Sequence, residues 1–188
     1  MFYTHFLGIN DEEREATMDL KEKIRSLKDY PKEGIIFRDI TTLLKDGEAF
    51  RACIDALKEL VKDESIDKVV AIEARGFLLG APLAYDLGVG FVPVRKPGKL
   101  PAATLSAEYD LEYGSDKVEM HIDAVAPGEK VLIVDDLLAT GGTGKAAVEI
   151  CEAAGADVVG CLVLIELDGL NGREKIGVPV YSLMHFPA

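Results

Sequence analysis

Residues 131–143 read Val-Leu-Ile-Val-Asp-Asp-Leu-Leu-Ala-Thr-Gly-Gly-Thr, from Val131 to Thr143, and this stretch decides the fold. Four apolar residues in a row are typical of a strand buried inside a parallel sheet. Two adjacent carboxylates, Asp135 and Asp136, end that run, and a turn rich in Gly and Thr follows. Because open α/β sheets bind ligands at the carboxyl ends of their strands, the turn is predicted to form part of a binding site.

The chemistry of this turn indicates a phosphate attached to a sugar. Gly141 and Gly142 can take positive φ, which lets backbone N–H groups converge on an anion. The helix expected after them points the positive end of its dipole at the same place. The two aspartates would repel a bare phosphate, but carboxylates accept hydrogen bonds from the hydroxyls of a sugar phosphate.

Two other phosphate-binding patterns fit this stretch less well. The P-loop pattern fails twice, because Ala139 stands at its first Gly and Ala146 at its final Ser or Thr. The dinucleotide fingerprint fits Gly142–Ala147, and Glu166 lies roughly 20 residues further on, as that pattern requires. However, Asp135–Gly141 would separate the strand from those glycines and carry two negative charges towards a pyrophosphate.

The remaining chain alternates apolar runs with amphipathic stretches, which predicts an α/β fold with a parallel sheet and right-handed connections. The expected strands lie near residues 68–72, 90–94, 131–134, 158–167 and 180–183. The expected helices cover residues 50–61, 76–87 and 142–154, with a surface helix over 11–28 that Tyr30-Pro31 ends. Between them we expect a loop over 39–46, a long loop over 96–107 and a hairpin formed by 104–109 and 117–122.

Composition excludes several classes of protein. The chain has 188 residues, 48% of them hydrophobic, which suits one compact domain. Its net charge of −12 argues against nucleic-acid binding. No run reaches the roughly 18 apolar residues of a membrane span, and the first residues lack the basic region of a signal peptide. Three scattered cysteines in apolar surroundings indicate reduced, buried thiols, and we expect a cytoplasmic protein.

Residues 131–143 resemble the phosphoribosyl-diphosphate (PRPP) signature of the type I phosphoribosyltransferases. Further segments resemble the adenine-specific branch of that family and occur in its order: Gly34–Thr41, Glu73–Phe77, Arg95–Pro101 and Leu111–Gly114. The resemblance runs from about Met18 to the C-terminus. It implies one domain over residues 18–188, with a central twisted, mostly parallel sheet flanked by helices, a small N-terminal hood and a mobile catalytic loop. Residues 1–17 form an extension whose role the sequence leaves open.

The resemblance also implies an activity, the transfer of the 5-phosphoribosyl group from PRPP to adenine, giving AMP and diphosphate in purine salvage. It implies Mg²⁺ bound through the substrate rather than by protein ligands. It further implies a homodimer, because in some relatives one cation of the site comes from the neighbouring subunit. Two alternatives stay open, a PRPP- or nucleotide-sensing regulator on the same fold and a phosphoribosyltransferase for another base. A dinucleotide-binding oxidoreductase is the least favoured reading.

The resemblance assigns roles to individual residues. The grip on the 5′-phosphate is formed by Ala139, Thr140, Gly141, Gly142 and Thr143, and the ribose hydroxyls are taken by Asp135 and Asp136. The cations for the diphosphate are Arg75, Arg95, Lys96 and Lys99, with a cis peptide expected at Glu73-Ala74. Glu112 is the acid–base residue and Tyr113 helps to close the loop over the site. Adenine is bound by Ile36, Phe37 and Arg38, with the Phe37 ring stacked on the base.

Overall fold

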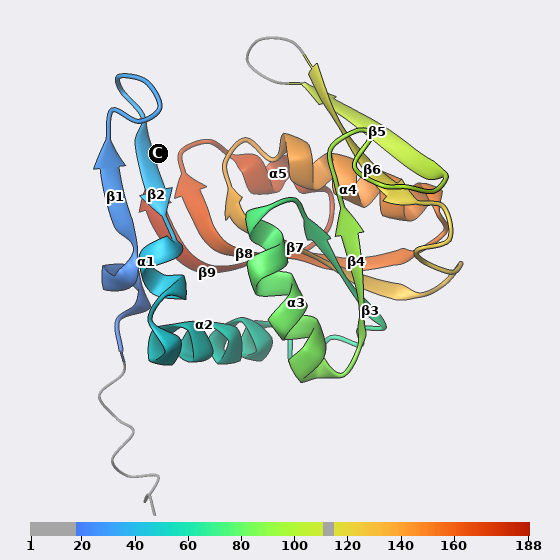
Figure 1. Ribbon diagram of the computed structural model, residues 1–188, viewed down its shortest axis with the longest axis horizontal. Helices are drawn as coiled ribbons and strands as arrows, with labels where there is room; N and C mark the ends of the chain where they lie inside the picture. The colour runs from blue at the N-terminus through green and yellow to red at the C-terminus, as the bar shows by residue number, and fades with distance from the viewer. Residues whose placement is uncertain (1–17, 111–114) are drawn as a thin grey trace, which may run out of the picture. The chain divides into compact units, whose positions relative to one another are not determined.

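The computed structural model describes residues 18–110 and 115–188 of the chain (Figure 1). The chain divides into two units, Met1–Phe50 and Arg51–Ala188. Helix α2 (Gly47–Leu60) contains the boundary between them. The expected boundary between residues 17 and 18 stays a prediction, because residues 1–17 lie outside the described part.

The described part of the first unit is built on a small antiparallel sheet. A 3₁₀ turn, η2 (Leu20–Lys23), leads into β1 (Arg25–Lys28), which pairs with β2 (Ile36–Asp39). The short helix α1 (Thr41–Leu44) follows β2. The Asp39 carboxylate fixes the start of this helix, because it accepts hydrogen bonds from the backbone N–H and the hydroxyl of Thr41.

Two expectations for this unit are wrong. The helix expected over Asp11–Lys28 is replaced, in its described part, by the 3₁₀ turn and strand β1, because Ile24 is extended at φ −91° and ψ 120°. The loop expected over 39–46 contains α1. In both cases Asp39 makes the stabilising contact: it pairs with Arg25 across the sheet, and it accepts hydrogen bonds from Thr41, the first residue of α1. The spacing of apolar residues carries no trace of such contacts.

The second unit contains a five-stranded sheet in the order β4-β3-β7-β8-β9. Its strands are β3 (Lys68–Ile72), β4 (Gly90–Val94), β7 (Lys130–Leu138), β8 (Asp157–Asp168) and β9 (Val180–Pro187). Every neighbouring pair is parallel. The expected parallel α/β sheet is therefore confirmed, and the carboxyl ends of all five strands lie at one edge.

Helices cover both faces of this sheet. On one face α3 (Arg75–Leu87) packs so closely that a Cβ on Gly80 would lie 2.6 Å from Ala71 Cβ. On the other face α4 (Gly142–Ala153) and the hairpin β5 (Thr104–Asp110) and β6 (Ser115–His121) share an apolar cluster with Val70 and Ile72. A fifth helix, α5 (Gly172–Ile176), lies between β8 and β9 in the chain and was not expected from the sequence. Within the described ranges no helix has the length and apolar character needed to cross a bilayer.

Candidate active site

The two aspartates lie inside strand β7 rather than after it. The strand continues past its apolar run to Leu138, and Asp135 pairs in register with Val163 of β8. The side chain of Asp136 is only 5% exposed, and its Oδ2 lies 2.9 Å from Arg75 Nε. The Asp135 carboxylate accepts a hydrogen bond from the backbone N–H of Asp136 at 2.8 Å. Sheet pairing therefore holds both carboxylates on a rigid element.

Burial makes the ionised forms of these carboxylates costly. It raises the pKa of Asp135 well above the ordinary value, and the charge of Asp136 raises it further. Burial also raises the pKa of Asp136, although the nearby Arg75 acts in the opposite direction. Despite that ion pair, Asp136 Oδ2 accepts no hydrogen bond from any described residue. A buried oxygen in this state is ready to accept a hydroxyl of a ligand.

The turn after β7 forms a small cavity. Gly141 takes φ 82° as the N-cap of α4, and no side chain caps that helix. The cavity, of about 100 Å³, is lined by Asp135, Leu137, Leu138, Ala139, Thr140, Gly141, Gly142, Thr143, Gly144, Cys161 and Val163. The five residues predicted to grip a phosphate thus lie together, with the uncapped end of α4 beside them.

A second cavity, of about 230 Å³, lies at the ends of β3, β4 and β7. It brings together the predicted residues Arg75, Arg95, Lys96, Asp135 and Asp136. The close approach of α3 to β7 requires a glycine, because a Cβ on Gly76 would lie 2.8 Å from Val134 O. The cis peptide expected at Glu73-Ala74 is present just before this contact.

Carboxylates hold the cations of this cavity, and the sequence did not reveal them. Glu73 accepts hydrogen bonds from Arg95 Nε at 3.1 Å and from the backbone N–H of Lys96 at 2.9 Å. Burial acts to raise the pKa of Glu73, but these two donors outweigh it and the pKa is lowered. The Lys96 ammonium contacts Asp116 and the hydroxyl of Tyr109. An anion that enters the cavity must therefore compete with Glu73 and Asp116.

The lining of these two cavities does not include Lys99. The Lys99 side chain is exposed and lines neither of them, while its carbonyl accepts a hydrogen bond from Arg95 at 3.2 Å. Glu112 and Tyr113 lie outside the described residues. Their roles, and that of Lys99, stay predictions.

The predicted adenine-binding residues belong to the first unit, where they occupy strand β2. The Phe37 ring meets the Tyr30 ring edge to face, with 5.3 Å between centroids. Arg38 donates a hydrogen bond to the Ser26 hydroxyl at 2.6 Å. Together with Ile36 they form a local constellation on one strand, and their role in binding a base stays a prediction.

Comparison with known proteins places the chain among relatives. The phosphoribosyl transferase domain family matches residues 39–185. An adenine phosphoribosyltransferase of a Synechococcus species is 56% identical over 170 residues, which cover 90% of this chain and 99% of that protein. The crystal structure of adenine phosphoribosyltransferase from Thermoanaerobacter pseudethanolicus superposes with a TM-score of 0.87 at 55% identity, over 89% of this chain and 98% of that one. The enzyme from Saccharomyces cerevisiae, solved with an imino-altritol bisphosphate and adenine, gives a TM-score of 0.84 at 43% identity over 88% and 96%.

Proposed function

The chain belongs to the adenine phosphoribosyltransferase family, and from that premise we propose that it transfers the 5-phosphoribosyl group of PRPP to adenine, releasing AMP and diphosphate in purine salvage. One observation carries the proposal: the glycine turn at Ala139–Thr143 adjoins the carboxylates of Asp135 and Asp136, and Arg75, Arg95 and Lys96 lie beside them. This arrangement suits a ligand that has a phosphate, vicinal hydroxyls and a second anionic group. The yeast relative named above was crystallised with a bisphosphate of an imino sugar and with adenine, which supports the same pairing of ligands.

The aspartates act on the ribose in this proposal. A bond forms between N9 of adenine and the anomeric carbon while the bond from that carbon to the diphosphate oxygen breaks. Positive charge develops on the ribose ring, and adenine loses its N9 proton. Asp135 and Asp136 accept hydrogen bonds from the ribose hydroxyls and stabilise the positive charge, which favours the transition state over the ground state.

The cations act on the leaving group. Arg75, Arg95 and Lys96 bind the diphosphate and balance the negative charge that builds up as it departs. Mg²⁺ is the proposed cofactor, bound through PRPP, and it neutralises part of the diphosphate charge when present. This mode needs no cage of protein ligands, since Mg²⁺ commonly keeps several waters and binds substrate phosphates. Among the described residues no group of three His, Cys, Asp or Glu forms a metal site.

The residues proposed to bind the base come from the resemblance to the phosphoribosyltransferase family. Glu112 handles the proton at N7 or N9, and Tyr113 helps to exclude water. The backbone at Ile36 and Arg38 meets the 6-amino donor and the N1 acceptor of adenine. Hypoxanthine reverses both groups, and a site left with unpaired polar groups can discriminate by about 10⁴-fold or more.

The remaining parts of the proposal concern assembly and location. We place the active form as a homodimer, and helix α3 supports this because it exposes Leu78 and Tyr85, which are two turns apart and therefore on one side. The cytoplasm is the proposed location, since Cys53, Cys151 and Cys161 are free and buried as in a reducing compartment.

One assay tests the reaction. Protein, Mg²⁺ and PRPP are mixed with adenine, hypoxanthine, guanine, xanthine or orotate in turn, and diphosphate release is followed. We expect turnover with adenine alone. Turnover with a different base would identify a phosphoribosyltransferase of other specificity. PRPP binding without turnover on any base would identify a regulator built on this fold.

A further inference from the structure

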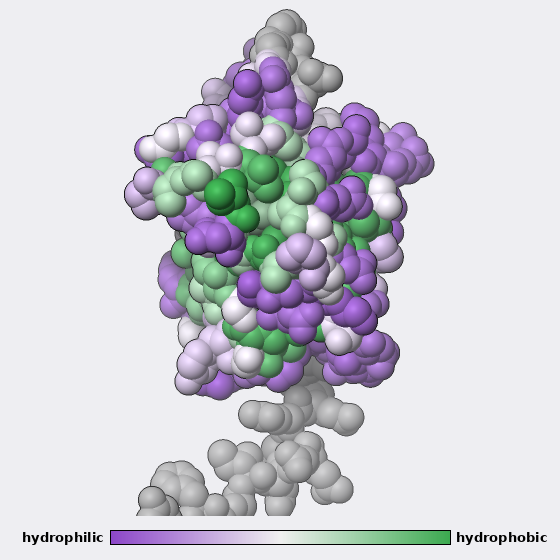
Figure 2. Space-filling view, turned by 90° about the vertical axis from the view of Figure 1, so that its right-hand side faces the viewer, coloured by the Kyte–Doolittle hydropathy of each residue, from purple (hydrophilic) through white to green (hydrophobic). Residues whose placement is uncertain are grey.

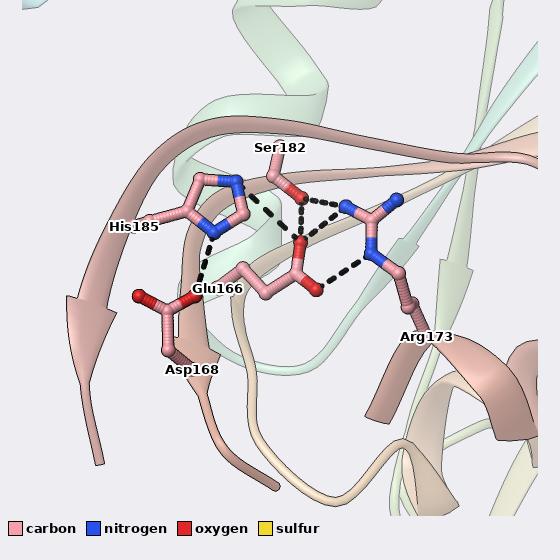
Figure 3. Close-up of polar contacts among 5 residues, drawn as sticks. All are labelled: Glu166, Asp168, Arg173, Ser182 and His185. Carbon is pink, nitrogen blue, oxygen red and sulfur yellow. Dashed lines mark hydrogen bonds and ion pairs between the residues drawn. The ribbon is translucent and has the colours of Figure 1, made fainter. Parts of the chain in front are cut away.

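A polar cluster lies outside both cavities, between the last residues of β8, strand β9 and helix α5 (Figure 3). Its centre is Glu166, whose side chain is only 10% exposed. Arg173 binds both of its oxygens, with Nε 2.8 Å from Oε1 and Nη2 2.5 Å from Oε2. The Ser182 hydroxyl donates to the same carboxylate. His185 stands beside them, with Nδ1 2.9 Å from the Asp168 carboxylate.

The contact between Glu166 and Arg173 joins two charged groups. Arg173 is the main cause that lowers the pKa of Glu166 to about 2, and Ser182 contributes in the same direction. Glu166 is therefore ionised at neutral pH. A two-point bond between a guanidinium and a carboxylate also fixes the direction of both side chains. Glu166 is thereby engaged with Arg173 instead of the ribose hydroxyl that a dinucleotide fingerprint would assign to it.

This cluster holds the short helix α5. Arg173 is the second residue of α5, which spans only Gly172–Ile176. Helices of this length do not form by themselves in water. The residue before it, Asn171, is left-handed at φ 52° and provides no side-chain cap. The helix therefore depends on the Arg173–Glu166 ion pair to hold it in place.

The start of α5 lies directly against the turn proposed to bind the 5′-phosphate. A Cβ added to Gly141 would lie within 3.0 Å of the Gly172 carbonyl oxygen, and one added to Gly172 would meet the Ala139 carbonyl equally closely. At the other end of α5, Ile176 reaches α4, where a Cβ on Gly144 would lie 2.5 Å from its Cδ1. The backbone of α5 is thus a supporting wall for the turn.

We infer that Glu166, Arg173 and Ser182 are positioning residues, which hold α5 against Ala139–Gly141 and so fix the grip on the 5′-phosphate of PRPP. This inference rests on the proposed function, since it takes the turn to be the 5′-phosphate site. The three side chains act through Gly172 and do not line either cavity. Their loss lets the turn relax, and small errors in the placement of a binding group can cost orders of magnitude in rate or affinity.

The test compares two substitutions that each disturb an ion pair, one next to the turn and one at the amino end of β3. Arg173→Lys keeps the charge of the ion pair but loses its two-point geometry. Lys68→Gln breaks a partly buried ion pair with Glu129, 2.7 Å long, at the start of β3 and away from the turn. For each variant we measure kcat, the KM for PRPP, the KM for adenine, the melting temperature and, by calorimetry, the Kd of ribose 5-phosphate.

In Arg173→Lys we expect the KM for PRPP and the Kd of ribose 5-phosphate to rise by roughly tenfold, with kcat and the KM for adenine changed by less than about twofold. Lys68→Gln should lower the melting temperature and leave these constants as in the wild type. The inference is overturned if Arg173→Lys binds ribose 5-phosphate like the wild type, or if Lys68→Gln shows the same rise. Should Arg173→Lys fail to fold, Glu166→Gln, which keeps the size of the side chain but loses the ion pair, decides by the same two constants. A wild-type protein that neither binds ribose 5-phosphate nor consumes PRPP would instead overturn the proposed function and the inference with it.

Discussion

Asp135 illustrates, at the scale of one residue, how a binding group can cost stability. Its pKa in the folded chain is raised above the ordinary 3.8 by burial and by Asp136. A carboxyl whose pKa is raised on folding gives its full contribution to stability at low pH and loses it as the pH rises through the folded value. At neutral pH the folded chain therefore carries the cost of ionising this group.

Asp135→Asn should relieve that cost. The amide oxygen can still accept the hydrogen bond from the Asp136 N–H, while the charge is gone. We expect the variant and the wild type to have nearly equal free energies of unfolding at about pH 4, and the variant to be more stable by about 1 kcal/mol at about pH 7.5. Denaturant unfolding of the ligand-free proteins measures this difference. A stability difference that does not change with pH would contradict the raised pKa of Asp135. The same variant should also bind PRPP more weakly than the wild type.

Glu112 offers a second prediction about one residue. If it handles a purine proton, Glu112→Ala should lower kcat by about 10²-fold or more and leave the Kd of PRPP close to the wild-type value. Glu108→Ala is the matched control, because Glu108 is an exposed carboxylate of strand β5 and its partners are Ser115 and Lys117. An equal loss of kcat in both variants would mean that disturbing the β5–β6 hairpin lowers kcat, and it would contradict the acid–base role of Glu112.

At the scale of elements, the sequence predicted the strands and helices whose formation depends on neighbouring residues in the chain. Strands β3 and β4 have the expected bounds, and α4 ends one residue earlier than expected. Their apolar runs and periodic spacing are read along the chain itself. Strand β1 and helix α5 were missed because their formation depends on Asp39 and Glu166, which are remote partners supplied by the fold.

The candidate site also has a part that could be predicted from the sequence and a part that could not. The turn at Ala139–Thr143 was predictable, because glycine spacing and helix dipoles are local properties. The carboxylates that hold its cations were not predictable: Glu73 lies 22 residues from Arg95 and Asp116 lies 20 from Lys96. Glu73 directly follows a buried strand at the binding edge of the sheet and belongs to the segment Glu73–Phe77, and these two signals place it near the site without identifying its partner.

The phosphate turn provides a prediction about an element. Gly141→Ala places a Cβ against the Gly172 carbonyl at a positive φ of 82°, so the turn and α5 must move apart. Gly128→Ala is the control, since Gly128 has φ 81° but nothing within 4 Å of its Cβ position. We expect Gly128→Ala to cost about 1 kcal/mol of stability, the price of the left-handed backbone alone, and Gly141→Ala about 3 kcal/mol. Only Gly141→Ala should raise the KM for PRPP, and equal effects of both variants would refute the contact.

At the scale of the whole molecule, charge and substrate oppose each other. The chain has 33 acidic against 21 basic residues, and Figure 2 shows hydrophilic residues around an apolar patch on one face. An anionic substrate is repelled at long range, but salt screens that repulsion beyond roughly 8 Å under physiological conditions. Binding must therefore depend on cations within that distance. Arg75, Arg95 and Lys96 line the cavity, and each has a carboxylate partner that holds it there.

Lys99 is the remaining predicted cation, and the proposed homodimer offers it a role in the site of the partner subunit. Its side chain is exposed and lines neither cavity of its own chain, although it lies in the same basic segment as Arg95 and Lys96. We expect Lys99 to act in the site of the partner subunit. Lys99→Ala and Glu112→Ala should then each be nearly inactive alone. Mixed under conditions that allow subunit exchange, they should recover up to about a quarter of wild-type activity, because half of the dimers are mixed and each mixed dimer has one intact site. Light scattering on the same samples gives the molecular mass. A dimeric mixture that stays inactive would assign Lys99 to its own subunit, and a monomeric mass in an active wild type would remove the dimer from the mechanism.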